Sequence, residues 1–310
     1  MRVASWLRIA VSVTFVGFIL WRVPTTTLWR AFGDLHGRSL WPAAACVLAM
    51  LAVRCLKWHQ LLGAGGSPSL QSHSVRSLFG GFALGIMAPG RLGEVGRCLF
   101  VPESDRAPVL LLNILDRAFD LWALLTTAVA SLFFVVARPP ALFAVGVWLA
   151  CMPFVIGLPR LVSKIGSVSW WPEKFRAQLL AAGAPLTNIP WGRFGALALL
   201  STWLDLLVFF FALRAFQRID LAVAMATFPW VVMAGGLPIS VSGLGAREGA
   251  AALLLASYGI SSPAAVDAAL LLIALTALFP AIVGGIWLVV SRLKRGPLAV
   301  KSLESLLGGA

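Results

Sequence analysis

The sequence predicts an all-α integral membrane protein with about six transmembrane helices and two re-entrant hairpins made of half-helices. Its 310 residues are 60% hydrophobic and only 12% charged, and the mean hydropathy is +0.91. A soluble domain carries about 25% charged residues, so this chain lacks the polar surface that a soluble fold of its size needs. The apolar residues also gather in runs of about 20, the length that a helix needs to cross a bilayer core.

Six runs have the length and composition of membrane-spanning helices. They cover residues 3–23, 40–62, 108–137, 141–158, 191–213 and 264–290, and Arg138-Pro-Pro separates the third from the fourth. A signal peptide is the alternative interpretation of the first run, but Trp-Arg-Val-Pro follows Leu20 in place of a small-residue cleavage site. Residues 159–190 form a polar linker between the fourth and fifth runs.

Two further apolar stretches, 72–101 and 221–258, are broken in the middle by proline, glycine and charge. The breaks read Ala88-Pro-Gly-Arg-Leu-Gly-Glu-Val-Gly-Arg97 and Pro238-Ile-Ser-Val-Ser-Gly-Leu-Gly-Ala-Arg-Glu248. Irregular backbone at membrane depth is tolerated only inside protein or beside a water-filled cavity, because lipid offers no hydrogen-bond partner. We therefore expect each stretch to form a re-entrant hairpin.

The order span, span, hairpin, span occurs twice, in residues 1–137 and again in 141–290. Each half crosses the membrane an odd number of times, so the second half is expected to be inverted, as in many secondary transporters. The result is a single transmembrane domain over 1–310 with a short basic tail at 291–310.

Loop charge predicts the orientation. With the N-terminus in the cytoplasm, thirteen basic residues fall on the inner face: Arg2, Arg8, Arg76, Arg106, Arg160, Lys164, Lys174, Arg176, Arg193, Arg292, Lys294, Arg295 and Lys301. Six fall outside: Arg22, Arg30, Arg38, Arg138, Arg214 and Arg218. Cytoplasmic loops carry an excess of Lys and Arg, so we expect a protein of the cell (inner) membrane with both termini in the cytoplasm.

Eleven ionisable residues lie inside the apolar elements and sum to +1: Arg54, Lys57, Arg91, Arg97, Arg117, Arg247, Glu94, Asp116, Asp120, Asp205 and Glu248. Each would cost about 2.5–3.5 kcal/mol at the centre of a lipid-facing helix, so they are expected to face one another or a wet cavity. On the third span, Asn113, Asp116, Asp120 and Thr127 share one helical face. Interhelical pairs that only hold the bundle together are the alternative. Arg54 and Lys57 are interpreted as snorkelling from a helix end.

Each break has the composition of a phosphate receptor, with arginines beside the amino-terminal N–H groups of a half-helix. Gly93 opens the half-helix after Arg91, and Arg247 opens the one after the second break. The two glutamates either orient the arginines or bind a cationic part of a headgroup. The predicted substrate-binding residues are Pro89, Arg91, Gly93, Glu94, Arg97, Asp116, Asp120, Asp205, Pro238, Ser240, Ser242, Gly243, Gly245, Arg247 and Glu248.

Other chemistries find no support in the sequence. It contains no G-x-x-x-x-G-K-[ST], H-E-x-x-H or G-x-S-x-G motif, so neither ATP hydrolysis nor serine-nucleophile catalysis is expected. The four cysteines and three histidines are scattered without zinc-site spacing, so we expect no metal and no other cofactor. The net charge of +13 lies in loops between apolar runs, which indicates anionic lipid headgroups and not a nucleic acid.

Pro89-Gly-Arg-Leu-Gly-Glu94 with Arg97, together with Pro238 to Glu248 in that order, resembles the lysylphosphatidylglycerol synthase transmembrane family. This flippase-like domain occurs at the N-terminus of multiple peptide resistance factors and also in free-standing archaeal dolichol-pathway and hopanoid-associated proteins. Asp116-Arg-Ala-Phe-Asp120 resembles the family's acidic segment, and the resemblance covers nearly the whole chain. Nothing follows Ala310, so we expect the soluble synthase domain of the bifunctional members to be absent.

The resemblance implies movement of a polar-headed lipid between leaflets, by a flippase or a scramblase. The substrate would be anionic or lipid-linked, and polyprenyl-linked, aminoacyl and hopanoid lipids are the classes that the resemblance suggests. One alternative is an integral membrane transferase, or its membrane subunit, that uses the intramembrane acids as bases. Another is a transporter of a small soluble anion.

Overall fold

The structure is a computed structural model that describes residues 40–65, 68–85, 92–102, 105–135, 190–236 and 245–294. All the regular elements in these residues are helices, which agrees with the predicted fold class. The spans predicted at 3–23 and 141–158 lie outside the described residues, as do residues 295–310 of the C-terminal tail and all but the last residue of the linker.

Four long helices correspond to predicted spans. They are α3 (Leu40–Gly65), α6 (Arg106–Val135), α9 (Trp191–Phe216) and a continuous helix made of α12 (Ser262–Ile273), η4 (Ala274–Leu278) and α13 (Phe279–Lys294). Among the described residues, three segments are long and apolar enough to cross a membrane: Leu40–Ala64, Trp191–Phe216 and Ser262–Trp287. The chain is therefore an all-helical protein with membrane-spanning helices.

Each broken stretch folds as two short helices. The first contains α5 (Ser74–Gly85), preceded by α4 (Pro68–Gln71), and the 3₁₀-helix η2 (Leu92–Phe100); the second contains α10 (Leu221–Gly236) and α11 (Ala246–Ala256). The middle of each break, 86–91 and 237–244, lies outside the described residues. The sequence did not predict that η2 would be a 3₁₀-helix. Because residues i and i+3 eclipse in such a helix, Glu94 lies directly beside Arg97.

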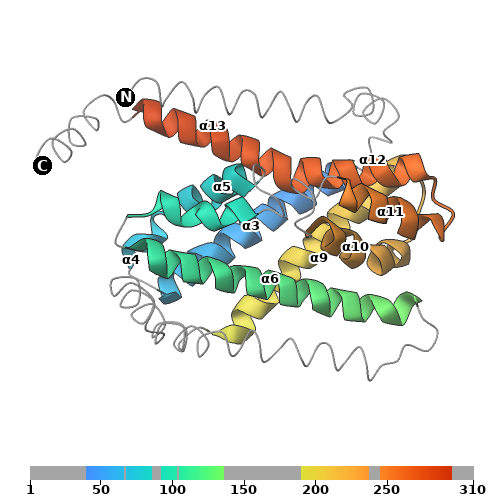
Figure 1. The fold of residues 1–310 in the computed structure, drawn as a ribbon, viewed down its shortest axis with the longest axis horizontal. Helices are drawn as coiled ribbons and strands as arrows, with labels where there is room; N and C mark the ends of the chain where they lie inside the picture. The colour runs from blue at the N-terminus through green and yellow to red at the C-terminus, as the bar shows by residue number, and fades with distance from the viewer. Residues whose placement is uncertain are drawn as a thin grey trace, which may run out of the picture.

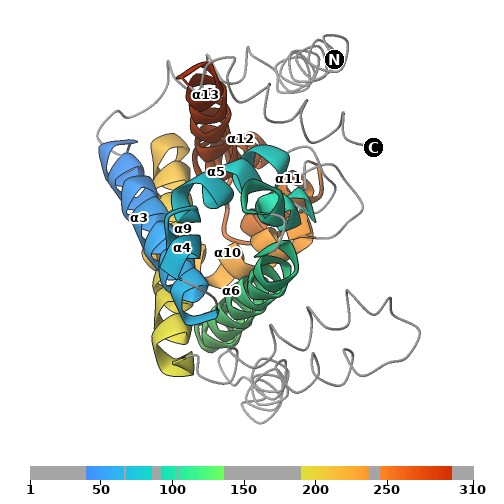
Figure 2. The ribbon, with the colours of Figure 1, turned by 90° about the vertical axis from the view of Figure 1, so that its left-hand side faces the viewer.

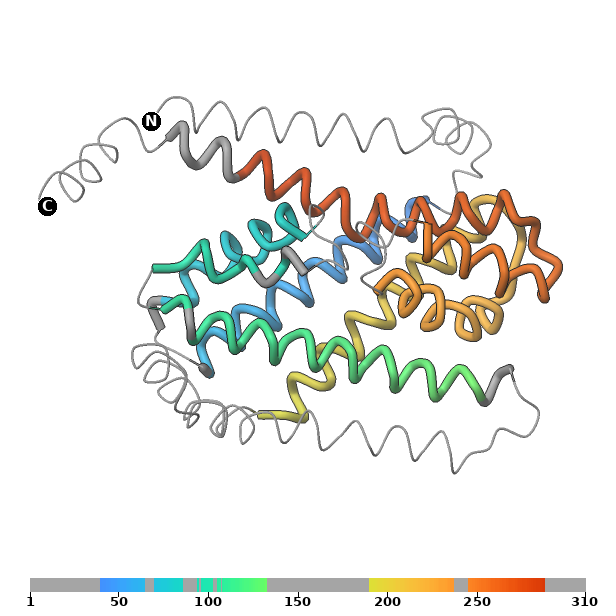
Figure 3. The backbone as a smooth tube through the Cα atoms, viewed as in Figure 1, coloured from blue at the N-terminus to red at the C-terminus, as the bar shows by residue number. Residues whose placement is uncertain are grey.

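α3 and α9 form an antiparallel pair. They run side by side in opposite directions, diagonally across the view of Figure 1, and form one flank of the helical bundle in the view of Figure 2. α6 and α13 lie on either side of this pair (Figure 1). Figure 3 shows α5 and η2 at one end of the molecule and α10 and α11 at the opposite end.

The contacts of the two broken stretches correspond to each other. α5 packs against α13, and α10 packs against α6, so the first helix of each stretch contacts the long helix that follows the other stretch. η2 packs against α6, and α11 packs against α12, so the second helix contacts the long helix that comes next in its own half. Each of these contacts therefore has a counterpart in which every helix is replaced by the equivalent helix of the other half, with residues 40–135 and 191–294 as the two halves.

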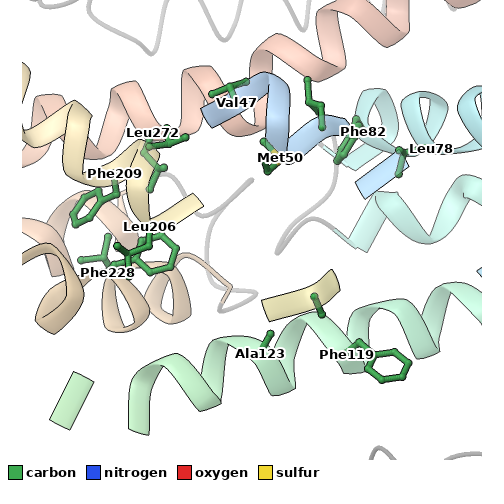
Figure 4. Close-up of a cluster of buried hydrophobic side chains, with 14 of the residues drawn as sticks. Val47, Met50, Leu78, Phe82, Phe119, Ala123, Leu206, Phe209, Phe228 and Leu272 are labelled. Atoms are coloured by element: carbon green, nitrogen blue, oxygen red, sulfur yellow. The ribbon is translucent and has the colours of Figure 1, made fainter. Parts of the chain in front are cut away.

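A continuous apolar core joins these elements (Figure 4). Phe209 of α9 and Phe228 of α10 pack with ring centroids 5.9 Å apart. Large apolar side chains such as Trp203, Leu253 and Ile286 are exposed on the outer surface. Apolar surface of this extent marks a contact region in a soluble protein, and it suits hydrocarbon here.

One glycine sets the distance between α5 and α13. A Cβ atom added to Gly284 would lie 2.4 Å from the backbone oxygen of Phe79. No side chain fits at that distance, so the two helices can approach this closely only because residue 284 is glycine. A Cβ atom added to the neighbouring Gly285 would meet open space.

Candidate functional site

Six charged side chains from three elements form one cluster inside the helical bundle. α3 contributes Lys57, η2 contributes Glu94 and Arg97, and α6 contributes Asp116, Arg117 and Asp120. Three are cations and three are anions, so the cluster is electrically neutral. Neutrality allows these charges to be buried within apolar helices, where an uncompensated charge is strongly destabilising.

Arg97 lies at the centre of the cluster and is 1% exposed. Its two terminal nitrogens donate to Asp116 Oδ2 at 2.7 Å and to Glu94 Oε2 at 3.3 Å. The guanidinium carbon lies 4.8 Å from the ring centroid of Trp58, within the range of a cation–π interaction. A phosphate could therefore bind these two terminal nitrogens only by displacing a carboxylate.

Lys57 joins α3 to α6. Its Nζ lies 2.9 Å from Asp116 Oδ1 and also donates to Asp120 Oδ1. The side chain is 2% exposed. Lys57 is more than two turns from the end of α3 at Gly65, which is too far for the ammonium group to reach the interface. The interpretation of Lys57 as a snorkelling residue is therefore wrong.

Arg117 and Asp120 are the accessible members of the cluster. One terminal nitrogen of Arg117 lies 2.7 Å from Glu94 Oε2 and the other lies 3.6 Å from Asp120 Oδ2, and the side chain is 38% exposed. The Asp120 side chain is 27% exposed. The cluster therefore has a buried base, made of Lys57, Glu94, Arg97 and Asp116, and an exposed rim, made of Arg117 and Asp120.

A separate ion pair joins α3 to α9. Arg54 donates to Asp205 Oδ2 at 2.5 Å through one terminal nitrogen and to Ser201 Oγ at 3.1 Å through Nε. The two charged side chains are 16% and 17% exposed, so the pair is more accessible than the base of the cluster. Arg54 is three residues before Lys57 in α3, so the pair lies less than one helical turn from the cluster.

Most of the predicted polar face of α6 points into the bundle. Asn113 is fully buried and donates from Nδ2 to the backbone oxygen of Glu94 at 3.0 Å, which fixes η2 against α6. Asp116 and Asp120 lie in the cluster. Thr127 donates its hydroxyl proton to the backbone oxygen of Ala123, within its own helix.

The second break places its charged residues at the start of α11. Gly245 has φ +90°, a conformation that favours glycine, and its N–H donates to Glu248 Oε2 at 2.5 Å. Glu248 thus caps the helix whose first turn contains Arg247. Arg247 is buried against α10, where a Cβ atom added to Gly235 would lie 2.5 Å from its Nε.

The structure brings part of the predicted site together. Glu94, Arg97, Asp116 and Asp120 meet in one cluster, Asp205 lies beside it, Gly93 is the second residue of η2, and Gly245, Arg247 and Glu248 begin the α11 region. The predicted residues Pro89, Arg91, Pro238, Ser240, Ser242 and Gly243 lie outside the described residues.

Three contributors were absent from the predicted site: Arg54, Lys57 and Arg117. Their charges were visible in the sequence, but their partners were not. The spacing of Arg54 and Lys57 is a usable signal, since residues i and i+3 share a helical face and two cations on one face of an apolar helix call for acids on a neighbouring one.

The fold and the buried charges define a helical membrane protein whose apolar core contains a cluster of ion pairs. The sequence model of the lysylphosphatidylglycerol synthase TM region family matches residues 5–284, and the chain belongs to this family. Its function therefore concerns membrane lipids. No curated protein matches the chain, and no solved structure matches it.

Proposed function

We propose that the protein moves a polar-headed lipid between the two leaflets of the inner membrane, as a flippase or a scramblase. The substrate headgroup is anionic or is linked to a lipid through phosphate. The observation that carries the proposal is the set of partly exposed charged side chains within apolar helices, on Arg54, Asp205, Arg117 and Asp120. A headgroup that crosses hydrocarbon needs such a polar surface, since each charge at the bilayer centre otherwise costs several kcal/mol.

The proposal includes an inverted repeat of residues 1–137 and 141–290, with six transmembrane helices and two re-entrant hairpins. Its support is the correspondence of contacts in which α5 packs on α13 as α10 packs on α6. Hairpins that enter from opposite sides would carry half-helix ends toward the midplane, where transporters of this plan bind substrate. Both termini lie in the cytoplasm in this arrangement.

In the proposed mechanism the arginines of the two breaks, Arg91, Arg97 and Arg247, supply positive charge along the path of the headgroup. Arg97 already has carboxylate partners, so a headgroup would exchange with them and not fill a vacant receptor. Glu94 and Glu248 position the arginines: the first pairs with Arg97 and Arg117, and the second caps the helix that bears Arg247.

Leaflet-resolved lipid movement tests the proposal. The purified protein is reconstituted into liposomes that contain headgroup-labelled phosphatidylglycerol, an aminoacyl phosphatidylglycerol or a polyprenyl phosphate. Chemical quenching of the outer leaflet then reports transfer from the inner one. We expect transfer above that of liposomes with an unrelated helical membrane protein. Equal rates for all three lipids and the control would contradict the proposal.

The same liposomes separate the alternatives. A transferase would convert a supplied lipid into a product of different mass, which mass spectrometry of the extracted lipids detects. A soluble-anion transporter would take up radiolabelled phosphate or sulfate without moving lipid. Either result would replace lipid translocation as the function.

A further inference from the structure

We propose that Arg54 is a binding residue for a phosphate group and that the carboxylate of Asp205 occupies its place when no substrate is bound. The proposal rests on the proposed lipid movement, which it deepens by naming where the phosphate binds midway across the protein. The ligand chemistry is a phosphate monoester or diester, either on a lipid headgroup or free in solution.

Position is the first reason. Arg54 and Asp205 each lie near the middle of a long apolar helix, and α3 and α9, which belong to different halves of the chain, pack against each other. The pair therefore lies deep in the membrane and at the junction of the two halves of the chain. A headgroup that moves from one leaflet to the other has to pass through this depth of the membrane.

Accessibility is the second reason. Both side chains of this pair are partly exposed, whereas Lys57, Asp116 and Arg97 are exposed by only a few per cent. Arg54 uses Nε toward Ser201 and one terminal nitrogen toward Asp205. In the described part of the chain its other terminal nitrogen has no hydrogen-bond partner. A second oxygen ligand therefore has a donor available on the same guanidinium.

The form of the ion pair is the third reason. Arg54 and Asp205 are joined through one nitrogen and one oxygen, not through the two parallel bonds that make an arginine–carboxylate pair strong. A phosphate can accept both N–H groups of the fork and so compete with the single carboxylate bond. The Asp205 carboxylate can occupy the position of the phosphate because both are anions whose oxygens accept hydrogen bonds from arginine.

Exchange between the two anions also explains why the pair is useful. A cation left alone in the membrane would be strongly destabilising once the phosphate departs. Asp205 restores neutrality at that moment, and it withdraws when the phosphate binds. The chain thus carries its own competitor for the site.

Binding measurements on the purified full-length protein in a neutral detergent test this inference. Inorganic phosphate and dihexanoyl phosphatidylglycerol are titrated separately against the wild type, Asp205→Asn and Arg54→Gln, with thermal unfolding and calorimetry as the measurements. Arg214→Gln, which removes an exposed cation from the same helix α9, is the matched control. Dihexanoyl glycerol, which lacks phosphate, corrects for binding of the acyl chains.

Removal of the competing carboxylate is expected to lower the dissociation constant of Asp205→Asn for the phosphate ligand by about tenfold. Arg54→Gln is expected to lose the phosphate-dependent part of binding, and Arg214→Gln to match the wild type. A response to the lipid alone assigns the site to a headgroup, and an equal response to inorganic phosphate assigns it to a free anion. Unchanged affinity in Asp205→Asn, or wild-type affinity in Arg54→Gln, overturns the proposal.

Arg54→Lys covers the case in which Asp205→Asn does not fold. Lysine keeps the charge and the pairing with Asp205 but lacks the planar fork. We expect a folded protein whose phosphate affinity falls severalfold, and undiminished affinity overturns the proposal. A wild-type protein that binds phosphate at this site but moves no lipid in liposomes would contradict the proposed function and leave the site intact.

Discussion

Arg54 and Asp205 occupy the same position in two helices of equal length and form an ion pair with each other. Each is the fifteenth residue of a 26-residue helix, counted from Leu40 in α3 and from Trp191 in α9. When two antiparallel helices are related by a two-fold axis, equivalent residues meet only where the axis passes between them. The pair therefore supports the inverted repeat that we propose and locates its axis between α3 and α9.

The first prediction is that the charges of this pair can be exchanged. Arg54→Asp alone places two acids together and Asp205→Arg alone places two arginines together, so each should lower the thermal stability. The double variant restores an ion pair at equivalent positions and should recover most of the loss. A thermal-unfolding cycle of the four proteins should give a coupling energy of about 0.5–3 kcal/mol. Additive losses would show that the two side chains do not interact.

A second prediction separates Asp116 from Asp120. Asp116 is almost fully buried and lies between Lys57 and Arg97, so Asp116→Asn leaves buried cations under-compensated and should cost about 3–5 kcal/mol of stability. Asp120 is at the rim, and Asp120→Asn should fold with nearly wild-type stability and reduced lipid movement. Thermal unfolding beside the liposome assay measures both quantities. Equal stability of the two variants would contradict the division into base and rim.

The glycine pair in α13 gives a third prediction. Gly284→Ala forces a methyl group against the backbone oxygen of Phe79, which cannot rotate away, so α5 and α13 must separate. Overpacking of this kind typically costs about 1–3 kcal/mol. Gly285→Ala meets open space and is the matched control. The melting temperatures in detergent should fall for the first variant only, and equal melting temperatures would show that the helices are not held at this distance.

A second pair of adjacent glycines, Gly235 and Gly236 in α10, gives a fourth prediction. A methyl group at residue 235 would meet the guanidinium of Arg247, whereas residue 236 has open space around it. Because the clash is with the end of a flexible side chain, Gly235→Ala should move Arg247 without unfolding the protein. We expect lipid movement to fall at least severalfold in Gly235→Ala, with a small change in melting temperature, and Gly236→Ala to match the wild type. Unchanged movement in Gly235→Ala would argue that the position of Arg247 is unimportant for transport.

The fifth prediction is topological. In a chain whose four cysteines are replaced by alanine, a cysteine introduced at position 170 should react with a membrane-impermeant maleimide only after the cells are permeabilised. A cysteine at Ser261, in the exposed turn before α12, should react in intact cells. The expected orientation follows from the excess of basic residues on the cytoplasmic side. Labelling of position 170 in intact cells would reject the proposed arrangement.

The positions of the helices could be predicted from the sequence because the bilayer constrains them locally. A run of about 20 apolar residues in lipid is expected to be helical, because a helix pairs all the backbone groups within the segment and unpaired backbone groups are not tolerated there. Predicted spans at 40–62, 108–137 and 191–213 accordingly match α3, α6 and α9 within a few residues. The presence of charges in apolar elements likewise implied that the charges face inward.

Tertiary structure alone decided which charges meet. Lys57 contacts acids some 60 positions away on α6, and Arg54 contacts Asp205, 151 positions away on α9, and helical periodicity shows which face a residue lies on but not which helix faces it. The interpretation of Lys57 as snorkelling was wrong for this reason. The 3₁₀ form of η2 and the fit of Arg247 against Gly235 also depend on packing between helices. Residue types and hydropathy therefore determined a membrane protein with buried charge, and packing determined how that charge is neutralised.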